Sequence, residues 1–322
     1  MSPTRRSFLR AVSAGALGLR FANAAPGQGR PLRGIFPIAQ TPFTASDKLD
    51  IDALVAQVRF LDRCGVHGIV WPQRASEYAT LSESERIAGA EAVLAAGKAL
   101  RPAIVIGVQS PDLATAMRYA RHAEKHGADA LISLPPREDS DLQTAAAYYK
   151  EVGKATPLPF FVQTVGKMTV DFVIGMARDI PTLRYVKDEA AGGLPRISEF
   201  RRKAPHLQIQ TGNHGHTLLD EIARGSAGSM PAASFADLYV PVWNLWQEGK
   251  RREAMEAYSK TLLLITEVEQ YGIESLKYIL HVRGVFPHYG ARGGPAGRAS
   301  LDDEAKRTLR DLLEFLKPHL RA

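Results

Sequence analysis

Short apolar runs alternate with amphipathic segments along most of the chain. Eight runs rich in Val, Ile and Leu have the length of buried strands, and the segments between them repeat apolar residues at helical spacing. The expected strands are 34–43, 68–73, 103–108, 130–135, 159–164, 183–188, 207–212 and 228–232. The expected helices between them are 51–64, 82–100, 112–126, 142–156, 170–180, 194–203 and 217–224. This order is typical of parallel strands joined by crossover helices.

Eight strands alternating with helices predict an α/β fold that closes into a (β/α)8 TIM barrel over residues 32–233. After residue 233 the strand pattern stops. Further helical segments at 238–247, 251–271, 273–282 and 302–317 predict a C-terminal helical extension over 234–322. The active site of such a barrel lies at the C-terminal ends of its strands. We therefore expect the chemistry of this chain to lie where its strands end.

Residues 1–24 have a different character from the rest of the chain. Arg5 and Arg6 precede a modest apolar stretch, 11–21, and the segment ends in Ala22-Asn23-Ala24. It resembles a twin-arginine export signal cleaved near Ala24, which predicts a folded protein delivered to the periplasm. An amphipathic N-terminal helix or a membrane anchor is the alternative, although the apolar stretch is shorter than the ~20 residues that a membrane span needs.

Composition and charge bear on which partners and which covalent cross-links the chain can have. The chain has 322 residues, 45% of them hydrophobic, with a formal net charge of +7, which is ordinary for a globular protein. Residues 1–24 hold four arginines and no acid, so the remaining 37 basic residues nearly balance 34 acidic ones. This balance gives no electrostatic reason to expect nucleic acid as a partner. Because Cys64 is the single cysteine, no internal disulfide can form.

Lys187 stands at the end of the sixth expected strand. A lysine that loses hydration at a barrel mouth has a pKa below the ordinary ~10.4 and supplies a neutral amine, which attacks a ketone to form a Schiff base. The protonated imine then withdraws electrons, so that a neighbouring carbon–carbon bond or hydroxyl group can be broken away. A solvent-exposed lysine without a chemical role is the alternative interpretation.

Seven short motifs support the chemical interpretation of Lys187. They stand at 41–43, 65–68, 77 with 81–86, 135–136, 158–159, 187–188 and 212–213. In order and approximate spacing they resemble the dihydrodipicolinate synthase / N-acetylneuraminate lyase family over nearly all of residues 32–320. The resemblance implies a (β/α)8 barrel with a helical extension, usually a homotetramer. It also implies that Lys187 forms an imine with pyruvate or another 2-oxo acid, and that no metal or organic cofactor is required.

The chain departs from this family at two motifs. Residues 73–77 read Gln-Arg-Ala-Ser-Glu where the family usually has Gly-Thr-Thr-Gly-Glu. Gln163 and Thr164 occupy the place of a Tyr-Asn pair whose Tyr is the proton shuttle of the family. A glutamine can orient a substrate oxygen or a water but has no titratable proton. We therefore expect a reaction other than lysine biosynthesis, with another group moving protons.

The site residues follow from strand ends and from the resemblance. We expect Lys187, Gln163 and Glu77 to be catalytic, with Glu77, Asp188, Glu189, His214 and His216 all open as proton carriers. Substrate binding is expected from Thr41, Arg74, Ala75, Ser76, Arg137, Thr164, Asn213 and Ala232. Arg74 can replace the missing threonines as a bidentate carboxylate anchor, or it can face solvent. The His214-Gly215-His216 pair leaves a metal-dependent aldolase open.

These observations predict a periplasmic Schiff-base lyase, of the aldolase or dehydratase kind, acting on a small-molecule 2-oxo acid such as a keto-deoxy sugar acid or an arylidene pyruvate. The alternative is a non-catalytic 2-oxo acid binding or sensory protein that retains the barrel, since the missing Tyr and Thr side chains would otherwise reduce the rate.

Overall fold

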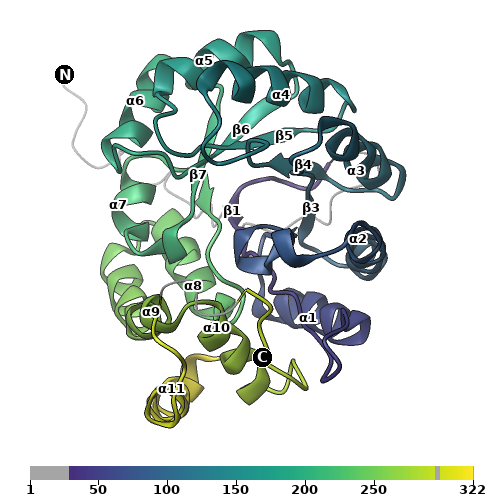
Figure 1. The fold of residues 1–322 in the computed structure, drawn as a ribbon. Helices are drawn as coiled ribbons and strands as arrows, with labels where there is room; N and C mark the ends of the chain where they lie inside the picture. The colour runs from purple at the N-terminus through teal and green to yellow at the C-terminus, as the bar shows by residue number, and fades with distance from the viewer. Residues whose placement is uncertain (1–28, 294–297, 322) are drawn as a thin grey trace, which may run out of the picture.

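Eight parallel strands form one closed ring in the computed structural model, which describes residues 29–293 and 298–321. The strands are β1 (Gly34–Ile35), β2 (Gly68–Trp71), β3 (Ala103–Gly107), β4 (Ala130–Ser133), β5 (Phe160–Gln163), β6 (Leu183–Asp188), β7 (Gln208–Thr211) and β8 (Gly228–Ser229). Their order is β1-β8-β7-β6-β5-β4-β3-β2. A bridge from Ile38, after β1, to Val70 of β2 joins the two ends of the sheet, so the barrel is closed (Figure 1). The predicted (β/α)8 barrel is confirmed.

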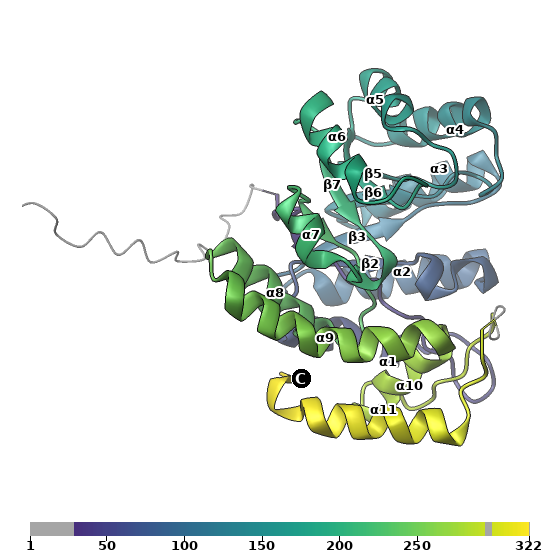
Figure 2. The same ribbon diagram turned by 90° about the vertical axis from the view of Figure 1, so that its left-hand side faces the viewer.

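A ring of helices surrounds the strands (Figure 1). It contains α1 (Ile51–Cys64), α2 (Glu83–Gly97), α3 (Leu113–Lys125), α4 (Leu142–Lys154), α5 (Val170–Asp179), α6 (Pro195–Lys203), α7 (Leu218–Ala223) and α8 (Ala236–Gln247). Helix α8 contacts α1 and β1, so this part of the 234–322 segment completes the ring. The extension itself is α9 (Arg251–Tyr271), α10 (Ile273–Val282) and α11 (Asp303–Leu316), which lie together below the barrel in Figure 2.

The first and last strands are shorter than the sequence pattern predicts. Residues 34–43 were expected as one strand, but β1 ends at Ile35 and the chain then pairs only through isolated bridges. Pro37 and Pro42 lack the N–H that a strand ladder needs, and Pro231 has the same effect after β8. The apolar run therefore continues into the barrel mouth as irregular backbone.

Helix starts follow local side-chain chemistry. Ser82 accepts a hydrogen bond from the backbone N–H of Glu85, whose carboxylate accepts from the N–H of Ser82, forming a capping box at α2. Asp50 and Asp112 cap α1 and α3 in the simpler way, each through its carboxylate. These caps fix where each helix begins and hence the lengths of the loops at the barrel mouth.

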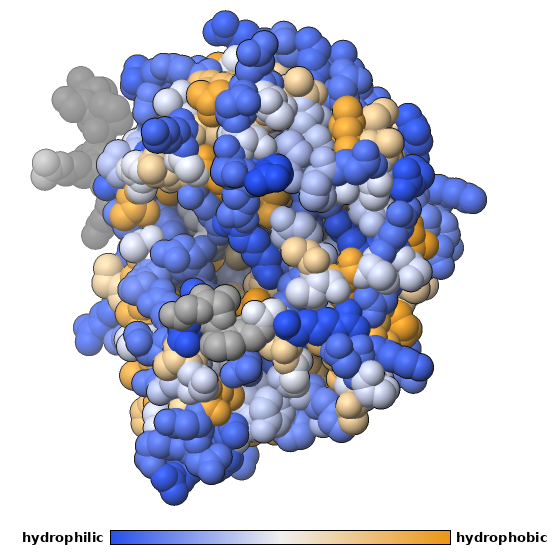
Figure 3. Space-filling model, in the orientation of Figure 1, coloured by the Kyte–Doolittle hydropathy of each residue, from blue (hydrophilic) through white to orange (hydrophobic). Residues whose placement is uncertain are grey.

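An apolar floor fills the inside of the barrel below its mouth. The interior cluster includes Phe36, Val105 and Phe161, and the ring of Phe161 stacks on that of Tyr185 with centroids 4.5 Å apart. Side chains alternate along a strand, so Gln163 and Lys187, two residues further on, face the same side. Polar side chains thus begin directly above an apolar floor, and Figure 3 shows hydrophilic residues around the hollow at the centre of the face seen in Figure 1.

No helix within 29–293 and 298–321 is long and apolar enough to cross a membrane. The expected export signal, residues 1–24, lies outside the described residues.

Candidate active site

Lys187 lies at the barrel mouth in contact with a carboxylate. Its side chain is only 6% exposed, and its Nζ lies 3.1 Å from Oε1 of Glu189. The other oxygen, Oε2, accepts hydrogen bonds from Nε2 of Gln163 at 2.5 Å and from Nη1 of Arg74 at 3.3 Å. Strands β5 and β6 pair Gln163 directly with Lys187, which places both side chains on one side of the sheet. We call Lys187, Glu189, Gln163 and Arg74 the Lys187 cluster.

The electrostatics of the cluster keep Glu189 ionised. Burial by itself raises the pKa of a carboxyl group, but the charges of Lys187 and Arg74, with the hydrogen bonds from Lys187 and Gln163, outweigh burial at this position. The pKa of Glu189 therefore lies below its ordinary value. The ionised carboxylate of Glu189 thus lies within hydrogen-bond reach of the buried Lys187 side chain, which is the arrangement that proton transfer between the two requires.

Gly212, at the end of β7, makes room for this pair. A Cβ atom at residue 212 would lie 1.7 Å from Oε1 of Glu189 and 2.9 Å from Cε of Lys187. Any side chain at this position would displace both functional groups. The glycine of the 212–213 motif is thus explained by close approach of side chains.

Four buried glutamines surround the mouth: Gln40, Gln73, Gln109 and Gln163, each at most 1% exposed. Gln73 donates to Gln109 at 2.9 Å, and Gln109 donates to the carbonyl of Pro72 at 3.0 Å. Within the described part of the chain, the side-chain oxygens of Gln40, Gln73 and Gln163 have no hydrogen-bond partner. Buried acceptors without partners are rare because they are costly, so these oxygens are suited to hydroxyl donors of a ligand.

Thr164 holds the backbone that carries Glu189. Its hydroxyl donates to Oδ1 of Asp188 at 2.7 Å and accepts from the N–H groups of Glu189 at 3.0 Å and Ala190 at 3.1 Å. Asp188 is also bound by both ends of the Arg196 guanidinium, at 2.9 and 2.8 Å. These contacts occupy Thr164 and Asp188 and give them a positioning role.

The 73–77 turn, which presents Arg74, is held to the 39–41 segment by two hydroxyl groups. Thr41 donates to the carbonyl of Ser76 at 2.6 Å, and Ser76 donates to the carbonyl of Ala39 at 2.5 Å. Ala75 packs against the interior apolar cluster. Arg74, besides its bond to Glu189, donates to Glu138 at 2.6 Å. Of the four predicted substrate-binding residues near this turn, Arg74 is the one that reaches the Lys187 cluster.

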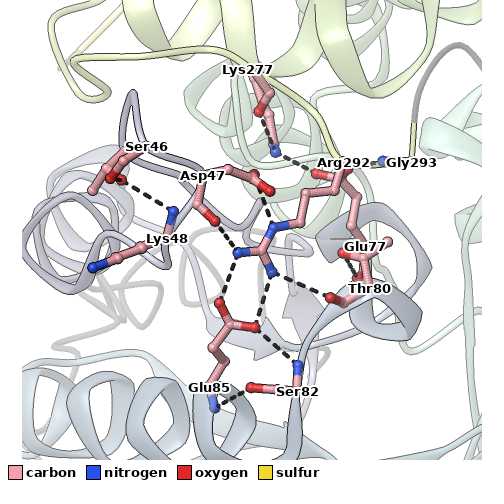
Figure 4. Close-up of polar contacts among 12 residues, drawn as sticks. Ser46, Asp47, Lys48, Glu77, Thr80, Ser82, Glu85, Lys277, Arg292 and Gly293 are labelled. Carbon is pink, nitrogen blue, oxygen red and sulfur yellow. Dashed lines mark hydrogen bonds and ion pairs between the residues drawn. The ribbon is translucent and has the colours of Figure 1, made fainter.

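Glu77 is engaged elsewhere. It stands in the left-handed region, with φ of 55°, and its carboxylate forms an ion pair with Lys277 of α10 and accepts from the N–H of Gly293 at 2.8 Å (Figure 4). Nearby, Arg292 bridges Glu85 and Asp47. The structure therefore places Glu77 at the junction between barrel and extension. Burial lowers the pKa of Lys277, and the charge of Glu77 opposes that effect.

The turn after β7 is strained and carries two histidines. Asn213 and His214 both have positive φ, 48° and 53°, which costs of order 1–3 kcal/mol for each non-glycine residue. Tyr239 donates to the carbonyl of His214 at 2.5 Å and holds this turn. Burial lowers the pKa of His214, which also feels the charges of Lys187 and Glu189. His214 is therefore a neutral imidazole beside the Lys187 cluster.

The two histidines do not form a metal centre with a third ligand. His216 pairs with Glu269, its Nδ1 lying 2.8 Å from Oε1. Across residues 29–293 and 298–321, the one group of three side chains with metal-ligating atoms close together is Glu91, His122 and His126, on the outer helices α2 and α3. The metal-dependent alternative thus gains no support at the barrel mouth.

Two further predicted binding residues lie apart from the cluster. Arg137 has a side chain 73% exposed and pairs with Asp139 at 3.1 Å. Ala232 is buried where its backbone bridges Ile38. A separate surface cavity of about 520 Å³ lies between residues 43–47 and 281–291, and none of its lining residues belongs to the Lys187 cluster.

Sequence comparison places this geometry among known proteins. The model of the dihydrodipicolinate synthetase family matches residues 31–315. A 4-hydroxy-tetrahydrodipicolinate synthase of Rhizobium meliloti is 29% identical, over 78% of this chain and 88% of that protein. An L-2-keto-3-deoxyarabonate dehydratase of Azospirillum brasilense is 28% identical, over 79% and 85%. The crystal structure of dihydrodipicolinate synthase from Rhodopseudomonas palustris superposes with a TM-score of 0.79 at 26% identity, covering 88% of this chain and 97% of that one.

Proposed function

Since the chain belongs to the dihydrodipicolinate synthetase family, we propose that it is a lyase in which Lys187 forms a Schiff base with a 2-oxo acid. The observation that carries this proposal is the buried amine of Lys187, 3.1 Å from the Glu189 carboxylate at the barrel mouth. The amine attacks C2 of the 2-oxo acid, water leaves, and the protonated imine withdraws electrons from C3. An adjacent carbon–carbon bond is then cleaved, or an adjacent hydroxyl group leaves.

The polar groups around Lys187 favour a hydroxylated substrate. Arg74 is the cation that a substrate carboxylate can reach from the Lys187 amine, through the bidentate geometry of its guanidinium. The free side-chain oxygens of Gln73 and Gln163 suit hydroxyl donors. We therefore assign a keto-deoxy sugar acid as the substrate class, ahead of an arylidene pyruvate. The dehydratase named among the relatives acts, by its name, on a compound of this kind.

Lysine biosynthesis fits the site less well. Gln163 carries no titratable proton, and the hydroxyls of Thr41 and Ser76 already donate to the backbone carbonyls of Ser76 and Ala39. The relative named as a synthase therefore supports the fold and the imine chemistry proposed for Lys187. We do not extend its substrate to this chain.

Turnover can be tested with a panel of 2-keto-3-deoxy acids followed by NMR. An aldolase would release pyruvate and an aldehyde, whereas a dehydratase would release water and a 2-oxo acid with a second carbonyl group, at an unchanged overall oxidation level. Activity with at least one hydroxylated 2-oxo acid, lost in the Lys187→Ala variant, is expected. A protein that binds these acids tightly without converting any of them would instead be the binding or sensory protein.

The export proposal has its own test. Residues 1–24 carry the paired arginines and the small-residue processing site. Material recovered from the periplasm is expected to begin near Ala25 when its N-terminus is sequenced. Periplasmic material that still begins at Met1 would contradict cleavage.

Gly212→Ala is expected to reduce turnover about 10²-fold, because a displacement of about 1 Å in a reacting group has an effect of that size. The added Cβ would lie 1.7 Å from Glu189 Oε1, so the Lys187 cluster must shift. Steady-state kinetics measures the effect, with Gly175→Ala as control because nothing lies within 4 Å of a Cβ there. Equal activities of the two variants would show that Glu189 and Lys187 need not hold this geometry.

A further inference from the structure

We infer that Glu189 is the proton carrier of this site, taking a proton from Lys187 and returning protons to the reacting carbon and oxygen atoms. The inference rests on the proposed function, because it assigns a role at the Lys187 imine. Glu189 replaces, in function, the titratable group that the end of β5 lacks where Gln163 stands.

Contact with the reacting atom distinguishes Glu189 from the other candidates. Asp188 is held by Arg196 and Thr164, Glu77 by Lys277, and His216 by Glu269. Over the described residues, Glu189 is the acid paired with Lys187. A proton carrier must come within hydrogen-bond reach of the atom it serves, about 2.6–3.2 Å, and the 3.1 Å separation meets that condition.

The two oxygens of Glu189 have separate partners. Oε2 is bound by Gln163 and Arg74, which orient the carboxylate, while Oε1 faces the amine of Lys187. Gly212 leaves the space that Oε1 occupies, and Thr164 binds the backbone N–H of Glu189. Oε1 is therefore the oxygen positioned to exchange protons, and Gln163 acts as a positioning residue.

Every proton is accounted for during imine formation. The Lys187 ammonium gives one proton to Glu189 and becomes a neutral amine, which adds to C2 and leaves, after a proton passes from nitrogen to oxygen, a neutral carbinolamine. Glu189 then returns its proton to the carbinolamine hydroxyl, which leaves as water as the protonated imine forms. One carbonyl oxygen departs as one water, and Glu189 ends as the carboxylate that it was.

The same carboxylate then serves C3. In the imine, C2 is bonded both to the Lys187 nitrogen and to C3, so the proposal has Oε1, which lies 3.1 Å from that nitrogen, remove a C3 proton. Removal gives a neutral enamine and a protonated Glu189, and return of the proton restores the imine. The step needs no further reagent, because the electron pair of the C–H bond moves into the imine.

Substrate binding starts the proton transfer from Lys187 to Glu189. A substrate carboxylate that binds Arg74 competes with Glu189 for the guanidinium, which weakens the interaction that holds Glu189 ionised. The proton affinity of Glu189 then rises beside the Lys187 ammonium. The charged groups facing Glu189 are Lys187 from β6 and Arg74 from the turn after β2, with the imidazole of His214 beside them.

Deuterium exchange into pyruvate tests the role of Glu189 apart from imine formation. The methyl hydrogens of pyruvate exchange with D2O through the enamine, so loss of the methyl signal in 1H NMR reports C3 proton transfer. In Glu189→Gln we expect exchange to fall at least about 10²-fold, while borohydride reduction after prolonged incubation still traps an adduct at Lys187, because the imine forms more slowly but reaches equilibrium. Glu189→Asp keeps a carboxylate and is expected to recover part of the exchange.

The outcomes distinguish the role of Glu189 from the Schiff-base proposal on which it rests. The control is Glu256→Gln, the same chemical change at an exposed glutamate of α9, which should exchange at the wild-type rate. Exchange at the wild-type rate in Glu189→Gln, with an adduct present, would overturn the assignment of Glu189 alone. Absence of any adduct in the wild-type protein would overturn the Schiff-base proposal and the role of Glu189 with it.

Discussion

Replacing Lys187 by alanine is expected to reduce turnover by about 10⁴-fold or more, because loss of a covalent nucleophile removes the pathway itself. The variant should fold, since Glu189 keeps its bonds to Arg74 and Gln163 when the amine is gone. Steady-state kinetics with the best substrate of the panel measures the loss, and circular dichroism checks the fold.

The control for this variant is an exposed lysine. Lys250 lies between α8 and α9 and, among the residues that the structure describes, forms its ion pair with Glu248 on the surface. Lys250→Ala should keep wild-type activity. A Lys187→Ala protein that retained more than about a hundredth of wild-type turnover would show that the imine is not the catalytic species.

Lys277→Met is expected to destabilise the protein by about 3–5 kcal/mol, the usual cost of leaving one member of a buried ion pair without its partner. The side chains of Lys277 and Glu77 are 0% and 1% exposed, so water cannot replace the lost ammonium. The melting temperature should fall on the order of 10 °C, measured by calorimetry, for a protein of this size.

A double substitution makes the stability test specific. Glu77→Gln combined with Lys277→Met removes both charges, and it should be more stable than Lys277→Met alone because no unpaired carboxylate remains. Lys317→Met is the control, since Lys317 is 70% exposed and such substitutions usually change stability by less than about 0.5 kcal/mol. A melting temperature of Lys277→Met equal to that of Lys317→Met would contradict the proposed role of the pair.

The fold followed from the sequence because its signals are local. The apolar run of a strand and the apolar period of a helix each extend over a short stretch of sequence, and caps such as Ser82 with Glu85 lie within one turn. The prediction was too long at β1 and β8, where the prolines interrupt the ladder. Helix α8 closed the ring although its sequence has no mark that distinguishes it from the extension that follows.

The site was predictable only in part. Lys187 and Gln163 could be placed because they end expected strands, and side-chain alternation gives their direction. Glu189 was one of five candidate proton carriers, because the direction of its side chain depends on the turn after β6 and on the space left by Gly212. The partner of Glu77 lies two hundred residues away at Lys277, and no local pattern links such positions.

The most direct test of the Schiff-base proposal is borohydride trapping. The purified protein is incubated with pyruvate and with each acid of the panel, reduced, and measured by intact mass spectrometry and peptide mapping. The account predicts one reduced adduct per chain, located on Lys187 and absent from Lys187→Ala. A folded wild-type protein that gives no adduct with any of these acids, or an adduct that persists in Lys187→Ala, would contradict it.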